Sequence, residues 1–332
     1  MHQSFDTEPH VIHIDRPEIG LTAFIVLDQP SFDISAGGVR TRAYPSIAAA
    51  LDDAKALARA MTLKCALGGL PVGGAKAVVR LQDELRRDEA FIYLGKVVES
   101  LAGRFRTAGD LGTTEADLQL MASHTNFVHT NERELGRSVA LGLVACVENV
   151  RTERFNEKPS GLRVSVQGAG AIGSSVAREL ASGGYQVVIS DLDAVKAAQT
   201  GYTVVAAENA LVSEVEILSP CAIGGVVSEH TWSKIRSRII CGAANNIVSS
   251  LDVHWHLHRE GLIFVPDVVS SAGAVVDGIG ESVLGMDDRT NLILSLGETA
   301  REVLALSKRN DIPPHLAAVE LAASRISAKP RS

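Results

Sequence analysis

The sequence has 332 residues, a length that suits two domains better than one core. With 46% hydrophobic and 21% charged residues and a net charge of −7, it suits a soluble protein and lacks the basic surface typical of nucleic-acid binding. No apolar run approaches the roughly 20 residues that cross a bilayer, and the polar N-terminus has no signal-peptide core. We therefore expect a cytoplasmic protein without membrane or nucleic-acid partners, whose four scattered cysteines are free thiols.

The first half of the chain predicts helices and strands in alternation. Apolar residues recur at helical spacing over 46–67, with Asp53 and Arg59 on the opposite, polar face. Further elements are expected as a strand over 75–79, a helix over 88–102, a strand over 104–108 and a polar turn over 109–114. Glycines and a proline separate the first helix from the strand that follows it.

The second half predicts a parallel sheet. Residues 151–162 are polar and contain Pro159 and Gly161, which suits a domain boundary. Short apolar strands then alternate with helical stretches, at 164–167, 186–190, 216–219, 239–241 and 262–265. Strands that alternate with helices imply a doubly wound α/β fold. From about residue 280 the chain is helical to its end.

A glycine-rich motif, Val164 to Gly173, follows the first strand of this half and precedes a helix. Its GxGxxG spacing permits a tight turn and a close approach of the backbone to a pyrophosphate at the helix N-terminus. Asp191 ends the second strand, where a carboxylate can bind the ribose hydroxyls and repel a 2′-phosphate. Glycine-rich turns also occur for structural reasons alone, but strand, helix and acid together favour an NAD site. The expected contacts are Gly168, Gly170, Ala171, Ile172, Gly173 and Asp191.

Three charged residues of the N-terminal half are candidates for catalysis. Lys64 and Lys76 lie in apolar stretches, and burial lowers a lysine pKa toward neutrality, which makes a usable base. Asp110, on the polar turn, could accept a proton. Each lysine alone is more often a surface residue, and sequence spacing does not bring the three together.

Several segments together resemble the Glu/Leu/Phe/Val dehydrogenase family. They are Gly37–Arg40, Met61–Lys64, Gly69–Lys76, Thr107–Thr114, the glycine-rich motif, Pro220–Gly224, Gly242–Asn246, Pro266–Asp267, Ala272–Gly273 and Ser307–Arg309. The resemblance runs in order from about residue 20 to about residue 328, and is greatest to the leucine, phenylalanine and tryptophan branch.

The resemblance implies an NAD-dependent oxidative deamination of an L-amino acid to its 2-oxo acid. By this match Lys64 would hold the substrate carboxylate, Lys76 would be the base that activates water, and Asp110 would shuttle protons to and from the amino group. Further cofactor contacts would come from Cys221, Ala222, Ala243 and Asn245. Further substrate contacts would come from Ala36, Gly37, Gly38, Ala108, Ser271, Ala300 and Val303.

The implied organisation has three parts. Residues 1–145 would form the α/β substrate-binding, catalytic and dimerisation domain, and 146–280 the Rossmann-type NAD domain. Residues 281–332 would be helices that return to the substrate domain. Octameric leucine dehydrogenases carry a longer C-terminal extension than the short tail seen here, so we expect a homodimer.

The chain departs from the family pattern at two functional positions. Ser271 replaces an asparagine that orients the substrate, and Val139 replaces a hydroxyl residue expected near the nicotinamide. Ala36 stands where glutamate dehydrogenases have a lysine, and the small lining suggests a bulky apolar or aromatic substrate side chain, unless loops fill the space. Because both lysines and Asp110 are kept, an active enzyme is favoured, and an NAD-binding regulatory or interaction protein is the alternative.

A cluster of three histidines is a candidate metal site. His254 and His258 share a helical face, with His256 between them. No carboxylate or cysteine completes a ligand set, so we expect a solvated helix face and no metal.

Overall fold

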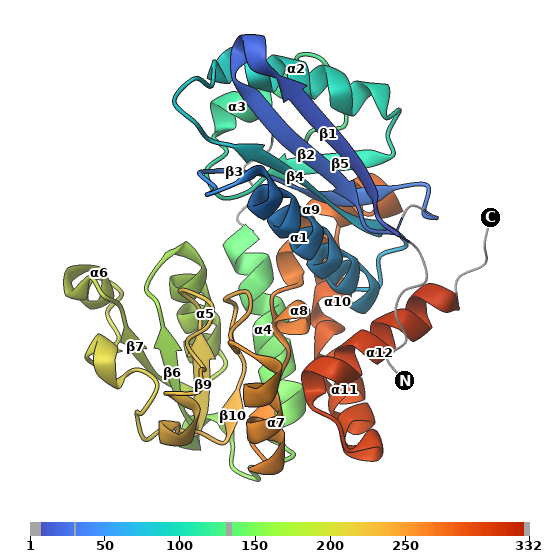
Figure 1. The fold of residues 1–332 in the computed structure, drawn as a ribbon. Helices are drawn as coiled ribbons and strands as arrows, with labels where there is room; N and C mark the ends of the chain where they lie inside the picture. Colours follow the sequence, from blue (N-terminus) through green and yellow to red (C-terminus); the bar gives the residue numbers. More distant parts are fainter. Residues whose placement is uncertain (1–7, 30, 131–134, 329–332) are drawn as a thin grey trace. The chain divides into compact units, whose positions relative to one another are not determined.

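The computed structural model describes residues 8–29, 31–130 and 135–328 (Figure 1). The chain forms two compact units. The first contains residues 1–66, 70–133 and 282–284, and the second contains 67–69, 134–281 and 285–332. None of the described helices is long and apolar enough to cross a membrane.

The first unit is built on a five-stranded sheet in the order β1-β2-β4-β3-β5. Its strands are β1 (His10–Arg16), β2 (Leu21–Leu27), β3 (Ser35–Arg42), β4 (Gly73–Arg80) and β5 (Phe105–Gly109). Its helices are α1 (Ile47–Leu67), α2 (Arg87–Ser100) and α3 (Glu115–Ala122). β3 runs parallel to both β4 and β5, whereas β2 is antiparallel to β1 and β4.

Alternation along the strands divides the core of this unit between the two faces of the sheet. Helix α1 covers one face, where Phe24, Val26 and Val78 pack against its alanines. Helix α2 covers the other face, where Ile25 and Ala77 join the larger cluster. Because β2 and β4 are covered on both sides, nearly all their residues are buried, including Thr22 on β2 and Lys76 on β4.

The second unit is built on a six-stranded parallel sheet in the order β11-β10-β9-β6-β7-β8. Its strands are β6 (Arg163–Gln167), β7 (Gln186–Ser190), β8 (Thr203–Val204), β9 (Ile217–Pro220), β10 (Ile239–Ile240) and β11 (Ile263–Phe264). Its helices are α4 (Leu135–Arg151), α5 (Ala171–Ser182), α6 (Ala194–Ala198), α7 (Leu251–Arg259), α8 (Asp267–Ser270), α10 (Thr290–Leu294), α11 (Leu296–Asn310) and α12 (Pro314–Ser327), with most of α9 (Gly273–Leu284). This is the doubly wound α/β arrangement that the strand–helix alternation predicts.

The two units divide the chain differently from the expected domain organisation. The second unit includes the whole of α4, because α4 is one continuous helix that contacts α5 and α11. The described C-terminal helices belong to the second unit, in which α11 contacts α4 and α8, and α12 contacts α7; their return to the substrate domain stays a prediction. The functional domain limits of 145 and 280 stay a prediction.

Candidate active site

Strand alternation brings three residues of the first unit to the face of the sheet that α1 covers. On β4, Lys76 lies two residues before Val78, whose side chain packs against α1. On β3, Val39 belongs to the cluster on the α2 face, so its neighbours Gly38 and Arg40 point the opposite way. The parallel register of β3 and β4 pairs Arg40 with Val78, two residues after Lys76 on the same face of the sheet.

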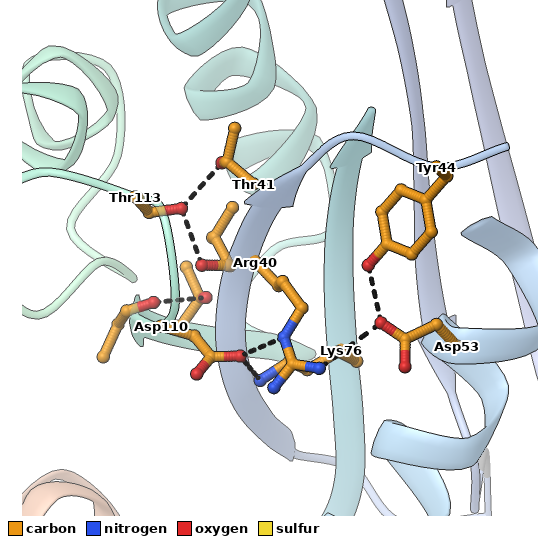
Figure 2. A network of polar contacts seen from close by, with 10 residues as sticks. Arg40, Thr41, Tyr44, Asp53, Lys76, Asp110 and Thr113 are labelled. Carbon is orange, nitrogen blue, oxygen red and sulfur yellow. Dashed lines mark hydrogen bonds and ion pairs between the residues drawn. The ribbon is translucent and has the colours of Figure 1, made fainter. Parts of the chain in front are cut away.

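Lys76 and Asp110 form the ion pair at the centre of this site. The Lys76 Nζ lies 2.7 Å from Asp110 Oδ2, and the lysine side chain is only 7% exposed (Figure 2). Burial lowers the pKa of Lys76 below its ordinary value, although Asp110 acts in the opposite direction. Burial alone would raise the pKa of Asp110, but Lys76 and Arg40 lower it overall. The pair therefore joins a lysine that loses its proton more readily than usual to a carboxylate that stays ionised.

The loop that carries Asp110 is attached to β3. The Thr113 hydroxyl donates to the Val39 carbonyl at 2.7 Å, and the Thr41 amide donates to the Leu111 carbonyl at 2.9 Å. The carboxylate is thus presented from a fixed turn rather than from a free loop end.

Two glycines of the family-like segments make room for this site. A Cβ on Gly38 would lie 2.9 Å from the Gly109 carbonyl oxygen, 3.0 Å from the Asp110 Cβ and 3.3 Å from Lys76 Nζ. A Cβ on Gly74 would lie 2.1 Å from the Thr62 amide nitrogen, so this glycine lets α1 pack directly on β4. Gly38 keeps space for the ion pair, and Gly74 serves the packing of the fold.

An arginine and an aspartate extend the ion pair toward α1 (Figure 2). Arg40 Nε donates to Asp110 Oδ2 at 3.0 Å, and Arg40 NH1 lies 3.3 Å from Asp53 Oδ2. The Tyr44 hydroxyl donates to the same Asp53 oxygen at 2.5 Å. Asp53 and Arg59 were expected on the polar face of this helix without partners in the fold. Instead, Asp53 forms an ion pair with Arg40, and an Arg59 nitrogen lies 3.6 Å from an Asp28 carboxylate oxygen.

The other residues expected at the substrate site are placed in both units. In the first unit, Lys64 is half-buried in the last turn of α1, while Ala36, Gly37 and Ala108 lie on β3 and β5. Gly37 brings β3 against β4, since a Cβ there would lie 1.7 Å from the Ala75 carbonyl oxygen. Their contacts with substrate stay predictions.

In the second unit the candidate substrate residues are enclosed. Ser271 is buried, and its hydroxyl donates to the Asp267 carbonyl one turn earlier at 2.6 Å. Ala300 and Val303 are fully buried on α11, which packs against α4. Val139, at the position of the missing hydroxyl, is also buried, and its neighbour Ser138 donates to Asp277 at 2.6 Å. The Ser271 hydroxyl is therefore already engaged within its own helix.

The glycine-rich motif forms the turn between β6 and α5. Gly168 has a φ of +107°, and a Cβ on Gly173 would lie 1.9 Å from the Gly168 carbonyl oxygen, so a larger residue at either position would strain the turn. A Cβ on Gly170 meets nothing closer than 3.9 Å, which leaves this backbone open to a ligand. Among the described residues no side chain caps the N-terminus of α5, where Ala171 and Ile172 are exposed. These features suit a dinucleotide pyrophosphate.

The carboxyl ends of neighbouring strands surround this turn. Cys221 and Ala222 follow β9, and a Cβ on Gly168 would lie 2.8 Å from the Ala222 Cβ. Ala243 is buried after β10, and Asn245 is exposed two residues further on. The parallel sheet thus gathers all four expected cofactor residues at one edge.

Asp191 lies at the carboxyl end of β7, as expected. Its Oδ2 accepts from the Ala169 amide at 2.7 Å, and its Oδ1 accepts from the Asp193 amide at 3.0 Å. These amides lower the pKa of Asp191, so the carboxylate is ionised beside the turn. A pocket of about 440 Å³ also borders Ala169, and its lining includes the cations Arg178 and Lys196.

The histidine cluster differs from the expected solvated face. His254 is 8% exposed and stacks on His315, with 4.6 Å between the ring centroids. His256 stacks on Trp232, with 4.7 Å between the ring centroids. His258 is half-buried and lies 3.0 Å from Asp311. Within the described residues, no group of three or more histidines, cysteines or acids is arranged to hold a metal ion.

Comparison with known proteins places this geometry in a family. A family model described as Glu/Leu/Phe/Val dehydrogenase, dimerisation domain, matches residues 12–127, and one described as Glutamate/Leucine/Phenylalanine/Valine dehydrogenase matches residues 189–287. The L-tryptophan dehydrogenase of Nostoc punctiforme is 33% identical over 335 residues, 96% of this chain and 93% of the relative. The leucine dehydrogenase of Bacillus cereus is 31% identical, over 98% of this chain and 92% of the relative.

A solved structure shows the same relationship. The crystal structure of L-tryptophan dehydrogenase from Nostoc punctiforme has a TM-score of 0.86 and 29% identity, covering 96% of this chain and 97% of that one. Fold and relatives define the class of the protein, an oxidoreductase that acts on the CH–NH2 group of amino acids. The chain belongs to the Glu/Leu/Phe/Val dehydrogenase family. The resemblance drawn from the sequence is confirmed, and the non-catalytic alternative gains no support.

Proposed function

We propose that this chain is an NAD-dependent dehydrogenase that reversibly deaminates an L-amino acid with a bulky apolar or aromatic side chain. The ion pair of Lys76 and Asp110, at 2.7 Å in a buried setting, is the observation that carries this proposal. Two of the relatives are named for tryptophan and leucine, which are both bulky and apolar. Ala36, fully buried on β3, offers no cation to a substrate carboxylate side chain.

The residues present fit a bound dinucleotide. The uncapped N-terminus of α5 and the open backbone at Gly170 would hold the pyrophosphate, and Asp191 would accept hydrogen bonds from the ribose. NAD would accept the hydride that leaves the substrate Cα. The ionised Asp191 opposes a 2′-phosphate, and this supports NAD over NADP, whereas Arg178 and Lys196 would favour a phosphate.

The proton transfers fall to the residues of the first unit. Lys64 would bind the substrate α-carboxylate through its ammonium. Asp110 would take a proton from the amino group before oxidation and return one to the departing ammonia. Lys76, with its lowered pKa, would remove a proton from the water that attacks the imino carbon.

The test is a spectrophotometric assay of NADH formation with L-tryptophan, L-phenylalanine, L-leucine, L-valine and L-glutamate, repeated with NADP. Turnover of one or more of the apolar substrates with NAD, and little turnover of glutamate, is the expected result. No turnover of any amino acid, or a preference for glutamate, would reject the proposed substrate class.

The assembly and location proposed with this activity are a cytoplasmic homodimer. The family model that matches residues 12–127 is described as a dimerisation domain, and this supports self-association through the first unit. Light scattering at micromolar concentration should give twice the mass of one chain. A monomer or a stable octamer would contradict the dimer.

A further inference from the structure

We propose that Arg40 is a positioning residue for the reaction. It holds Asp110 by the single oxygen Oδ2 and is itself held by Asp53. The charges of Arg40 and Asp53 change the proton affinity of the Lys76 amine in opposite directions. This inference rests on the proposed function of Lys76 and Asp110. Arg40 was named only as part of a family-like segment, and neither Asp53 nor Tyr44 was expected at the site.

The geometry makes the Asp110 carboxylate asymmetric. Lys76 Nζ and Arg40 Nε both contact Oδ2, at 2.7 Å and 3.0 Å, and in the described residues no ion pair engages Oδ1. Two donors on one oxygen fix the plane of the carboxylate. The Leu111 amide is a further donor to this carboxylate and lowers its pKa. Oδ1, which no described ion pair engages, is the oxygen on which Asp110 would accept a proton, while Oδ2 stays bound to Lys76 and Arg40.

Arg40 is itself immobilised. Its side chain is 15% exposed, and NH1 reaches Asp53 Oδ2, which also accepts the Tyr44 hydroxyl. Burial alone would lower the pKa of Arg40, but Asp110 and Asp53 raise it overall, so its positive charge is constant. Burial and the hydrogen bond to Asp53 raise the pKa of Tyr44, which remains a neutral donor.

The charges that face Lys76 come from three elements. Asp110 after β5 and Asp53 on α1 favour the ammonium form, whereas Arg40 on β3 disfavours it. The other charges near this face are Lys64 in the last turn of α1 and the pair Arg59 and Asp28. Because Arg40 and Asp53 carry opposite charges, removing one or the other should shift the proton affinity of Lys76 in opposite directions.

The experiment measures kcat/KM for deamination against pH in Arg40→Gln, Asp53→Asn and wild type. In Arg40→Gln the rising limb should move to higher pH by about one pH unit, because the repelling charge is gone and Asp110 pairs with Lys76 alone. In Asp53→Asn the limb should move to lower pH. Arg40→Lys keeps the charge, so its limb should stay near wild type, while kcat falls about tenfold because the fixed carboxylate geometry is lost.

Arg16→Gln is the matched control, since Arg16 lies on β1, pairs with Glu18 and stands over the Tyr93 ring. It should leave both the limb and kcat unchanged. The inference would be overturned if the rising limb moved in the same direction in Arg40→Gln and Asp53→Asn, or moved in neither. A purely structural role of these residues does not predict shifts in opposite directions. Thermal melting identifies any variant that fails to fold. If Arg40→Gln does not fold, the test rests on a limb at lower pH in Asp53→Asn and on a lowered kcat with an unmoved limb in Arg40→Lys; a lower limb absent from Asp53→Asn, or a normal kcat in Arg40→Lys, would overturn the inference.

A second readout needs no substrate. The rate at which acetic anhydride acylates Lys76, followed by peptide mass spectrometry over a pH series, reports the ionisation of this amine in the resting protein. The same opposed shifts are expected there. If wild type turns over no amino acid, the proposed function fails, but opposed shifts in acylation would still support the role of Arg40 and Asp53, and their absence would reject it.

Discussion

Lys76 in the first unit and His254 in the second are both buried bases, but their surroundings differ. The pKa of each is lowered by burial, that of His254 to about 3. Lys76 faces two carboxylates and a guanidinium, whereas His254 stacks on His315 and lies 5.2 Å from the Phe264 ring. The Nδ1 of His254 is buried without a hydrogen-bond partner in the described residues.

The difference separates a reactive base from a structural one. Lys76 has a carboxylate at 2.7 Å that can exchange protons with a substrate, so its lowered pKa can serve catalysis. The described ring contacts of His254 are with His315 and Phe264, and its lowered pKa makes it a neutral core residue near pH 7. A lowered pKa therefore indicates function only where an acceptor and a charge network accompany it.

The largest effect is expected at Asp110. Asp110→Asn keeps the size of the side chain but removes the proton acceptor, so turnover should fall by about 10²–10⁴. Asp117→Asn is the control, because Asp117 is a buried carboxylate of the same unit that is bound by Arg87 and caps α3. It should lower the melting temperature and leave the turnover of folded enzyme unchanged. Comparable turnover in Asp110→Asn and wild type would remove Asp110 from the mechanism.

Two glycine substitutions sharpen the distinction between site and scaffold. Gly38→Ala sets a Cβ 2.9 Å from the Gly109 carbonyl oxygen and 3.3 Å from Lys76 Nζ, which should displace the Asp110 turn and the amine and lower kcat/KM about a hundredfold. Gly74→Ala sets a Cβ 2.1 Å from the Thr62 amide nitrogen and should destabilise the packing of α1 on β4. Kinetics and thermal melting on both variants check this. Equal losses of stability would show that Gly38 serves packing alone.

A smaller effect is expected at the nucleotide turn. Asp191→Ala removes the acceptor for the ribose hydroxyls, so NAD should bind about tenfold more weakly and its advantage over NADP should narrow. Lys196→Ala is the counterpart on the neighbouring pocket and should weaken any residual use of NADP. Fluorescence titration gives the dissociation constants of NAD and NADP for each variant. An unchanged preference for NAD over NADP in Asp191→Ala would contradict the role of this residue.

The least effect on activity is expected at His254, whose influence is on stability. Because the folded pKa lies below the unfolded value, the unfolded chain binds more protons and stability falls as pH drops below about 6.5. The loss should be on the order of 2 kcal/mol between about pH 7 and about pH 5. His254→Phe should flatten this slope in urea titrations, whereas His256→Phe should not. An equal slope in wild type and His254→Phe would show that other groups dominate.

Much of the second unit was predictable from sequence. The strands at 186–190 and 163–167 and the glycine-rich turn follow local rules of spacing and turn chemistry. Helix α4 was missed although its pattern is amphipathic, with Val139, Leu143, Val147 and Val150 at helical spacing. Strand β2 was missed because it is buried on both faces, which removes the alternation of apolar and polar residues.

The candidate site was predictable only in part. The apolar context of Lys76, the place of Asp110 on a polar turn and the family resemblance predict these two residues, and the structure brings them together. Arg40 and Asp53 were not chosen, because their contact joins β3 to α1 across the sheet face, and no local pattern reports such a pairing. Gly38 and Arg40 are alternate residues of β3 and therefore lie on the same face of the sheet. This alternation is the signal that could have placed Arg40 at the site.

The central claim is that Lys76 is the base of an amino-acid dehydrogenase. The direct measurement is NADH formation by wild type and Lys76→Ala with the best substrate of the amino-acid panel, together with the NAD dissociation constant of each. We expect turnover in Lys76→Ala to fall by about 10²–10⁴ while NAD affinity is unchanged, because the cofactor residues belong to the other unit. Near-normal turnover in Lys76→Ala would contradict the account.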